Sequence, residues 1–160
     1  MSTVTRKKIK QSAAGITAPY GNAWKQRYNF TTSSAGIFTD SDLTTAVQSA
    51  DVVRIGLLPA GLELHDILAI ISDAFTGSTT ASIGFAYVDG VDSSDVPQSA
   101  TYFASALATD STGVSRKTAV TAPVVLPKDA YLILTIGGAA HASAGIIDII
   151  VDGVWKGSPA

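Results

Sequence analysis

Short runs in which apolar and polar residues alternate recur along most of the chain and are separated by Gly, Pro, Asp and Ser turns. From residue 23 onward they lie at spacings near the roughly 8–12 residues of sandwiches and barrels. Each run predicts a strand, because successive side chains of a strand point to opposite faces. The predicted strands are 23–32, 51–58, 62–74, 79–88, 114–120, 124–126, 131–136 and 145–154.

Two further segments leave alternatives open. Residues 102–107 predict a short strand or one helical turn, and residues 40–47 predict a short helical turn or a loop. No stretch longer than about ten residues keeps a helical face, and strands do not alternate with helices as they do in parallel sheets. We therefore predict an all-β fold, an antiparallel jelly-roll-like β-sandwich of about eight strands with an extended N-terminal arm.

Basic residues are concentrated at the start of the chain. The first 27 residues hold six of the eleven Lys and Arg residues and no acidic residue, whereas the other 133 residues carry five basic and thirteen acidic groups. The net charge of −2 thus hides a +6 segment attached to a −8 body. Residues 1–21 also show no helical or strand periodicity. We predict a basic N-terminal arm over residues 1–22 and a β-sandwich domain over residues 23–157.

A basic arm of this kind is typical of a segment that docks onto another surface. Four charges between residues 6 and 10 are few for nucleic acid, and the acidic body would oppose a duplex, so we expect no nucleic-acid partner. Tyr20, Trp24 and Tyr28 favour a protein partner, because aromatic side chains are enriched at interfaces. A disordered solubilising tail is the alternative.

Composition narrows the classes of protein further. The chain is 46% hydrophobic and has no cysteine, which excludes disulfides and Cys-ligated metals. The basic run is not followed by the apolar stretch of about 7–15 residues that a secretory signal needs. Residues 130–147 carry no charge, but Gly137, Gly138 and Gly145 break them, so we predict two strands and no membrane span.

No catalytic, cofactor or metal site emerges from the sequence. Glu63 and His65 would share a strand face, with Asp66 on the opposite face, but a third ligand at metal spacing is missing. His141, between alanines and glycines, is interpreted as a loop-tip residue with no role. The acidic loop around Asp92 does not match the EF-hand spacing, which favours a plain acidic loop over the alternative of a weak surface calcium site. We expect a protein that is not an enzyme.

Two stretches of the sequence carry a resemblance. Residues 53–61 (VRIGLLPAG) are followed by an apolar strand and by residues 75–84 (FTGSTTASIG), and the chain closes with residues 128–136 (KDAYLILTI), a small-residue loop and residues 144–151 (AGIIDIIV). This pattern, over roughly residues 52–154, resembles capsid decoration (cement) proteins of tailed bacteriophages. The N-terminal arm is not part of the shared pattern.

The resemblance implies a jelly-roll-type virion protein on the outer capsid surface. Such a protein would self-associate as a homodimer or homotrimer, bridge neighbouring major capsid subunits and stiffen the shell. The arm's role is inferred from charge alone, and loops 111–117 and 139–145 are second candidates for the contact. The residues expected to bind the capsid are Arg6, Lys7, Lys8, Lys10, Tyr20, Trp24, Lys25 and Arg27.

Two other functions are alternatives to capsid decoration. A carbohydrate-binding jelly-roll module of a phage head fibre or tail needs exposed aromatic residues on one sheet face, for which Tyr87, Tyr102 and Tyr131 are the available platform. A cupin-type enzyme needs clustered metal-binding histidines, and the chain has two histidines and one glutamate.

Overall fold

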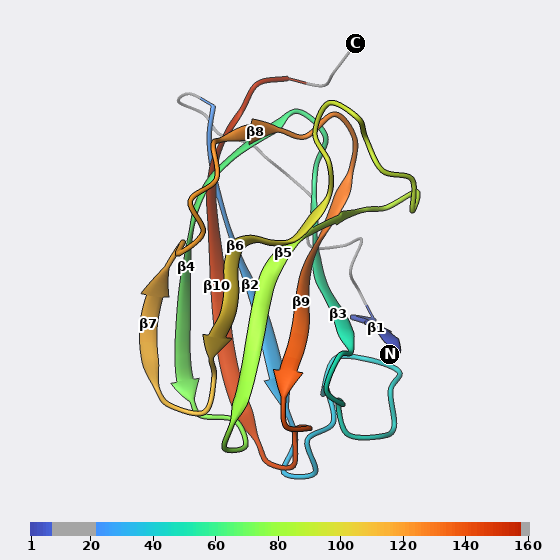
Figure 1. Ribbon diagram of the computed structural model, residues 1–160, viewed down its shortest axis with the longest axis vertical. Helices are drawn as coiled ribbons and strands as arrows, with labels where there is room; N and C mark the ends of the chain where they lie inside the picture. Colours follow the sequence, from blue (N-terminus) through green and yellow to red (C-terminus); the bar gives the residue numbers. More distant parts are fainter. Residues whose placement is uncertain (8–21, 158–160) are drawn as a thin grey trace.

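The fold is described for residues 1–7 and 22–157 of a computed structural model of the 160-residue chain. These residues form ten β-strands in two facing sheets and no helix (Figure 1). This part of the chain accordingly contains no helix with the length and apolarity that a membrane crossing requires.

Sheet 1 is the nearer layer in Figure 1. Its strands, in order, are β1 (Thr3–Thr5), β3 (Val52–Leu58), β9 (Ala130–Gly138), β5 (Thr79–Tyr87) and β6 (Ser99–Ala108). Neighbouring strands pair antiparallel, except that β1 runs parallel to β3. The strand β1 is therefore an addition to the edge of an antiparallel sheet.

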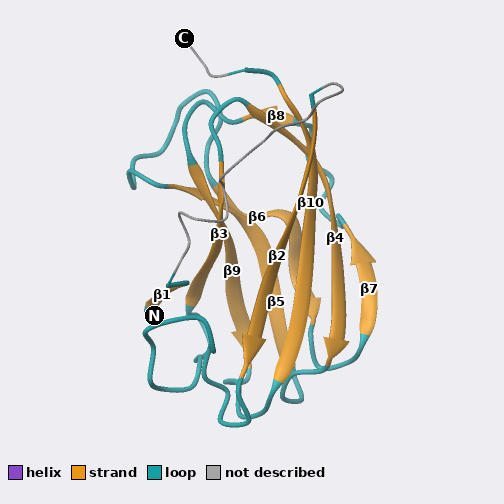
Figure 2. Cartoon of the chain, turned by 180° about the vertical axis from the view of Figure 1, so that it is seen from behind, coloured by secondary structure: helices purple, strands orange, loops and turns teal. Residues whose placement is uncertain are grey.

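Sheet 2 faces the viewer when the molecule is seen from behind (Figure 2). Its strands, in order, are β2 (Ala23–Thr32), β10 (Gly145–Trp155), β4 (Leu62–Asp73) and β7 (Gly113–Arg116). The short β8 (Val124–Val125) also pairs with β4, near the start of β4. All of these pairings are antiparallel.

The chain passes repeatedly between the two sheets. Strands β2, β4 and β7 lie in sheet 2 and strands β3, β5 and β6 in sheet 1, and then β9 and β10 insert into the middle of sheets 1 and 2 respectively. This connectivity, in which late strands lie beside early ones, is that of a jelly-roll-like sandwich. The predicted all-β sandwich is confirmed.

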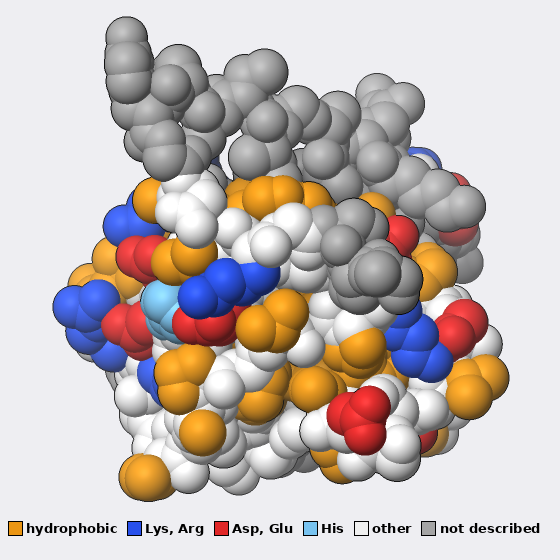
Figure 3. Space-filling model, turned by 90° about the horizontal axis from the view of Figure 1, so that it is seen from above, with side chains coloured by type: hydrophobic (Ala, Val, Ile, Leu, Met, Phe, Trp, Pro, Cys, Tyr) orange, Lys and Arg blue, Asp and Glu red, His pale blue; other side chains and the backbone are white. Residues whose placement is uncertain are grey.

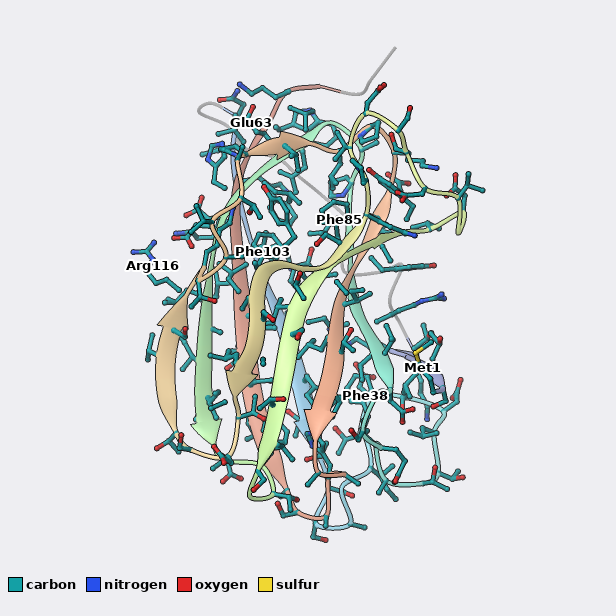
Figure 4. All side chains as sticks on the ribbon, in the orientation of Figure 1. Met1, Phe38, Glu63, Phe85, Phe103 and Arg116 are labelled. Atoms are coloured by element: carbon teal, nitrogen blue, oxygen red, sulfur yellow. The ribbon has the colours of Figure 1, made fainter. Side chains whose placement is uncertain are left out.

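The core lies between the sheets and is rich in aromatic side chains. Phe85 and Phe103, which are labelled in Figure 4, are fully buried there. Tyr28 of β2 joins the two layers, because its buried hydroxyl donates to the carbonyl oxygen of Leu57 in β3 at 2.7 Å. Burial raises the pKa of Tyr28 well above its ordinary value, so this hydroxyl stays a donor. Gly56 permits the approach, since a Cβ there would lie 1.9 Å from Tyr28 Cε1.

A second, smaller apolar cluster covers the outer face of sheet 1. Tyr131 and Ile133 of β9 point away from the core and are nevertheless only 8% and 5% exposed. The Arg54 guanidinium lies over the Tyr131 ring, 4.9 Å from its centre. The neighbouring side chains that pack against the two residues are Val52, Leu57 and Ala86.

The N-terminal segment departs from the prediction. Residues 1–21 were expected to have no strand structure, which is wrong for Thr3–Thr5, because these residues form β1 and pair in register with Val52–Arg54. Val4 is 4% exposed and belongs to the core. The pairing depends on contacts with residues more than forty positions away, which a local pattern does not reveal.

Three other segments resolve or change the expectations. Residues 102–107 lie within a strand, β6, and residues 40–47 form no helix. The strand predicted over residues 114–120 ends at Arg116. The second half of the strand predicted over residues 62–74 is apolar on both sides, a pattern that favours burial of both faces, but Leu68 and Ile70 are only half-buried.

Candidate docking surface

The outer face of sheet 2 carries apolar side chains framed by charges. Leu68 of β4 stands opposite Ile150 of β10 on one side and opposite Arg116 of β7 on the other. Ile150 in turn stands opposite Arg27 of β2. Directly opposed residues of a sheet share a face, so this row has two half-buried apolar side chains at its centre and an arginine at each end. Arg116 points outward from the β7 edge (Figure 4).

The adjacent row extends the apolar surface toward the β7 edge. Ile70 of β4 stands opposite Val114 of β7 and Asp148 of β10. Val114 is 68% exposed, which is high for a large apolar side chain on a sheet. We call Leu68, Ile70, Val114 and Ile150 the apolar strip. It forms a continuous path across β10, β4 and β7.

Each of three carboxylates on this face pairs with a cation from an edge strand. The Asp148 carboxylate accepts hydrogen bonds from Arg27 Nε at 2.9 Å and from Asn29 Nδ2 at 2.9 Å. The other pairs are Asp152 with Lys25 at 3.1 Å and Asp66 with Arg116 at 2.7 Å. The cations remain well exposed, so solvent screens these pairs and each contributes little to folding stability.

A shallow depression of about 290 Å³ lies within the face. Leu68 and Ile150 line it together with the charged groups of Lys25, Asp152 and Arg116. An apolar centre with a polar, solvent-accessible rim is the usual anatomy of a protein–protein interface. The outer face of sheet 2 is therefore suited to dock a protein surface.

The polar cluster at the start of β4 is arranged differently from the prediction. Glu63 and His65 do share the outer face, and their side chains hydrogen-bond at 2.6 Å. Asp66 was expected on the opposite face, which is wrong, because a β-bulge at this point places it on the outer face as well. Burial alone would raise the pKa of Asp66, but hydrogen bonds from the Lys117 and Ile67 amides and from Arg116 outweigh it and lower the pKa below its ordinary value.

Viewed from above, basic and acidic side chains gather around a histidine at one side of the molecule (Figure 3). In the cluster at the start of β4, His65 hydrogen-bonds to Glu63, and Lys156 forms an ion pair with Glu63 at 3.1 Å. The hydrogen bonds from these two residues hold the pKa of Glu63 below its ordinary value. Glu63 is therefore held as a carboxylate between two cationic or hydrogen-bonding neighbours, as in a solvated surface cluster.

The predicted arm residues fall into separate places. Arg6 forms an ion pair with Asp40, and Lys7 lies 3.7 Å from Asp42, so both cations are used within the chain. Lys25 and Arg27 lie in β2 and belong to the outer face of sheet 2. The remaining predicted residues Lys8, Lys10 and Tyr20 lie outside the described residues.

Trp24 stands apart from the other predicted contact residues. It is only 6% exposed and is part of the core, and its ring is thus not presented as an interface anchor in this conformation. Its neighbours Lys25 and Arg27 have exposed side chains. The alternation of β2 therefore separates a structural aromatic from the two cations that can meet a partner.

The tyrosine platform of the carbohydrate-binding alternative is wrong. Tyr87, Tyr102 and Tyr131 are only 2%, 4% and 8% exposed. The hydroxyl of Tyr102 donates to the carbonyl oxygens of Leu64 at 3.1 Å and Ala122 at 2.9 Å, which fixes the ring in the core. These side chains hold loops and sheets together and offer no exposed ring face to a sugar.

The prediction that His141 lies at a loop tip is also wrong. The residue is 2% exposed, and its ring lies 4.7 Å from Phe75 and 5.7 Å from Phe30, measured between ring centres. Within the described residues neither ring nitrogen has a hydrogen-bond partner. Burial lowers the pKa of His141 to about 4. Gly36, with a left-handed φ of 73°, lies against the His141 carbonyl, where a Cβ would come within 2.1 Å of the oxygen.

The acidic loop after β5 is held by its own hydrogen bonds. Asp89 forms an ion pair with Lys128 at 2.7 Å. Asp92 accepts hydrogen bonds from the amides of Ser93 and Gln98. In residues 1–7 and 22–157, no three His, Asp or Glu side chains come together in the manner of metal ligands.

Sequence reasoning missed most of the sheet 2 face. Leu68 and Ile70 lie in a stretch whose apolar pattern favours burial on both sides, and Ile150 and Asp148 had no assigned role. The available signal was the pairing of β2 with β10, in which Lys25 meets Asp152 and the Arg27–Asn29 stretch meets Asp148. That signal becomes visible only once the strand order is known.

No protein-family model matches the sequence, and no curated protein matches it. Among solved structures, the chain is similar to one in the "Capsid of Ralstonia phage GP4", with a TM-score of 0.64 and 14% identity, over 98% of this chain and 99% of that one. It is also similar to a chain in the "Cyanophage Pam1 capsid asymmetric unit", with a TM-score of 0.52 and 15% identity, over 89% and 95% of the two chains. At these identities the likeness is one of fold, and it extends over nearly the whole chain.

Proposed function

We propose that the protein is a non-enzymatic structural component of a bacteriophage virion. In this role it binds the outer capsid surface and stabilises the shell by bridging neighbouring major capsid subunits. The observation that carries the proposal is the fold likeness to a chain from the capsid of Ralstonia phage GP4 over 98% of this chain and 99% of that one. The resemblance of residues 52–154 to capsid decoration proteins supports it independently.

The outer face of sheet 2 is the surface that we assign to the capsid. Its apolar strip supplies the desolvated centre of an interface. Arg27 and Arg116 each pair with a carboxylate of the same chain and can pair instead with a carboxylate on the partner. A shell presents the same site many times over, so modest affinity per copy is enough when copies also contact one another. Self-association as a homodimer or homotrimer belongs to the same proposal.

The basic arm is a second contact in this proposal. Lys8, Lys10 and Tyr20 contribute charge and an aromatic ring. Removing residues 1–21 would also remove β1 and would confuse loss of binding with loss of structure. The appropriate variant is therefore the double substitution Lys8→Glu with Lys10→Glu, which leaves residues 1–7 intact.

The test is co-sedimentation with expanded capsids of the phage that encodes the chain, prepared without this protein. Wild-type protein is expected to pellet with the capsids at a fixed ratio to the major capsid protein. The double variant Arg27→Glu with Arg116→Glu is expected to lose most of this binding, because it places acidic groups beside Asp148 and Asp66. The Lys8→Glu/Lys10→Glu variant reports separately on the arm.

The control is Lys128→Glu, which reverses a partly exposed cation in the loop between β8 and β9, paired with Asp89 and outside the apolar strip, and is expected to bind like the wild type. Circular dichroism and thermal melts of each variant establish that the fold is retained. Absence of wild-type protein from the capsid pellet would overturn the decoration role. Binding that survives the arginine reversals but fails in Lys8→Glu/Lys10→Glu would move the contact from sheet 2 to the arm.

A further inference from the structure

The edge of β3 is built to receive a strand. Thr3, Val4 and Thr5 pair with Val52, Val53 and Arg54 in parallel register. Backbone hydrogen bonds extend the pairing, with the Val52 amide donating to the Ser2 carbonyl at 3.0 Å and the Arg6 amide donating to the Arg54 carbonyl at 3.1 Å. Addition of an extended segment to a free sheet edge is a recurring mode of peptide recognition.

A buried carboxylate recognises the start of this segment. Asp51 is 4% exposed, and its Oδ1 accepts hydrogen bonds from the Ser2 amide at 2.9 Å and the Ser2 hydroxyl at 2.8 Å. Its Oδ2 accepts from the Gln48 amide at 2.9 Å. Burial alone would raise the pKa of Asp51, but these hydrogen bonds outweigh it and lower the pKa. An empty edge would strip Oδ1 of these partners, which is unfavourable for a buried charge.

Two further contacts make the site selective for this segment. Val4 is 4% exposed and inserts into the core cluster. Arg6 forms an ion pair with Asp40, and the Lys7 amide donates to the Asp40 carbonyl at 2.8 Å. The edge therefore contacts a serine, an apolar residue and an arginine at alternating positions, the spacing of side chains that lie on one face of a strand.

The segment and the strand that follows it in the chain belong to different layers. Residues 1–7 contact β3 and the 40–51 loop, both attached to sheet 1, whereas β2 begins at Ala23 in sheet 2. Fourteen residues, 8–21, join the two parts and can span at most about 46–50 Å. That reach is comparable with the size of a small domain, so the same contacts are available to a segment from an adjacent copy.

We propose that copies of this chain exchange their N-terminal strands, so that residues 1–7 of one copy occupy the β3 edge of its neighbour. The proposal rests on the proposed function in one respect, because a shell holds copies side by side. Exchange of an identical element loses no contact, since the neighbour's Ser2, Val4 and Arg6 meet Asp51, the core and Asp40 as the chain's own residues do. It converts adjacent copies into a linked array.

The absence of cysteine from the chain permits a direct test. Thr3 and Val52 are paired in register on the outward side of the sheet, so Thr3→Cys and Val52→Cys place two thiols within reach of a disulfide. Capsid-bound protein carrying both substitutions is oxidised and run on a non-reducing gel. Exchange predicts dimers and a ladder of higher species, whereas a strand kept within its own chain gives only an internally linked monomer.

The sharper form mixes the two single variants before they bind capsids. A disulfide between Thr3→Cys protein and Val52→Cys protein forms only when the strand of one copy lies on the edge of another, and each variant alone is the control. A mixture that yields no linked heterodimer, together with a double variant linked wholly within one chain, overturns the proposal. The pair Thr5→Cys and Arg54→Cys repeats the test if the first pair disturbs folding.

The same samples separate the two proposals. Protein that pellets with capsids but is linked only within single chains retains the decoration role and loses strand exchange. If the protein does not pellet with capsids, the decoration role fails, and the oxidation is carried out on concentrated protein in solution. Linked dimers there support exchange without a capsid, and internally linked monomers overturn exchange as well.

Discussion

The two sheets have opposite outer faces. On sheet 1, Tyr131 and Ile133 are covered by their neighbours and by the Arg54 guanidinium, so an apolar surface is closed within the chain. On sheet 2, Leu68 and Ile150 stay half-buried and are surrounded by ion pairs whose cations point into solvent. Both faces alternate in the same way along their strands. The two faces differ in whether neighbouring side chains of the same chain cover the outward apolar residues.

This difference indicates which face is available to a partner. A closed cluster contributes to folding and offers little surface, whereas an open strip of apolar side chains gains free energy only when another surface covers it. The central strands β9 and β10 allow the contrast to be tested with the same substitution, because Ile133 and Ile150 both point outward from the middle of their sheets.

The largest effect is expected from Ile133→Asp on sheet 1. The new carboxylate would lie among Tyr131, Val52 and Leu57, where water is excluded, so the free energy of unfolding should fall by about 3 kcal/mol or more. Urea denaturation followed by circular dichroism measures the change. A loss below about 1 kcal/mol would mean that the sheet 1 face is as open as the sheet 2 face.

Acidification is expected to lower the stability of the fold through His141, which is buried and belongs to neither outer face. The folded protein holds His141 neutral until about pH 4, whereas the unfolded chain binds that proton near pH 6.5. Between these values the unfolded state binds more protons, so stability is retained above pH 6.5, falls as the pH drops toward 4 and then levels off. The loss should be on the order of 3 kcal/mol.

The substitution His141→Leu removes this titration and keeps an apolar contact with Phe30 and Phe75. Denaturation curves measured at several pH values give the free energy of unfolding at each pH. Between pH 6.5 and 4 this free energy should fall less steeply in the variant than in the wild type. Carboxylates such as Asp51 also lose stabilising bonds on acidification, and they contribute equally to both proteins. Equal slopes would show that His141 does not titrate as a buried group.

The matched substitution on sheet 2, Ile150→Asp, should affect stability little and binding strongly. Its carboxylate can reach water and lies opposite Arg27, so the free energy of unfolding should fall by only about 1 kcal/mol. Capsid co-sedimentation should nevertheless drop at least tenfold, because one of the four side chains of the apolar strip is now charged. Unchanged co-sedimentation would exclude the strip from the contact.

The smallest change is expected from Asp148→Ala. The substitution removes the pair with Arg27, whose side chain is 65% exposed, so the loss in the free energy of unfolding should be about 0.5–1 kcal/mol. Because salt screens exposed charges, the difference from the wild type should shrink in concentrated sodium chloride. A loss that is larger and independent of salt would mark Asp148 as part of the structural core.

Strand positions were predictable because the period of two is local. The predicted strand 23–32 coincides with β2, and those predicted over 62–74 and 79–88 differ from β4 and β5 by a single residue at the end. The strand β1 was not predictable, since the three residues Thr3–Thr5 are too few to establish a period of two, and the flanking Ser2 and Arg6 are held by distant Asp51 and Asp40. Local alternation thus predicts the longer strands, but it does not predict a short strand that is held by contacts with distant residues.

The candidate surface was predictable only in part. Lys25 and Arg27 were expected to meet a partner and do lie on an open face, but the aromatic beside them, Trp24, belongs to the core. The bulge that brings Asp66 to the same face as Glu63 depends on the pairing of β4 with β10. Burial of His141 depends on how three loops pack at one end of the sandwich. These outcomes follow from tertiary contacts that alternation does not encode.

The central place of β10 in sheet 2 governs the order in which the protein can form. Ala23 pairs with Val154, and β10 also separates β2 from β4 along its whole length. The strand that joins β2 to β4 in sheet 2 is therefore missing until residues more than a hundred positions beyond β2 have been synthesised. Contacts this distant in sequence slow folding, and until they form the exposed edges of β2 and β4 are open to association with other chains. The incomplete sandwich is consequently open to capture by chaperones, and folding of pulse-labelled protein should be limited by the arrival of β10.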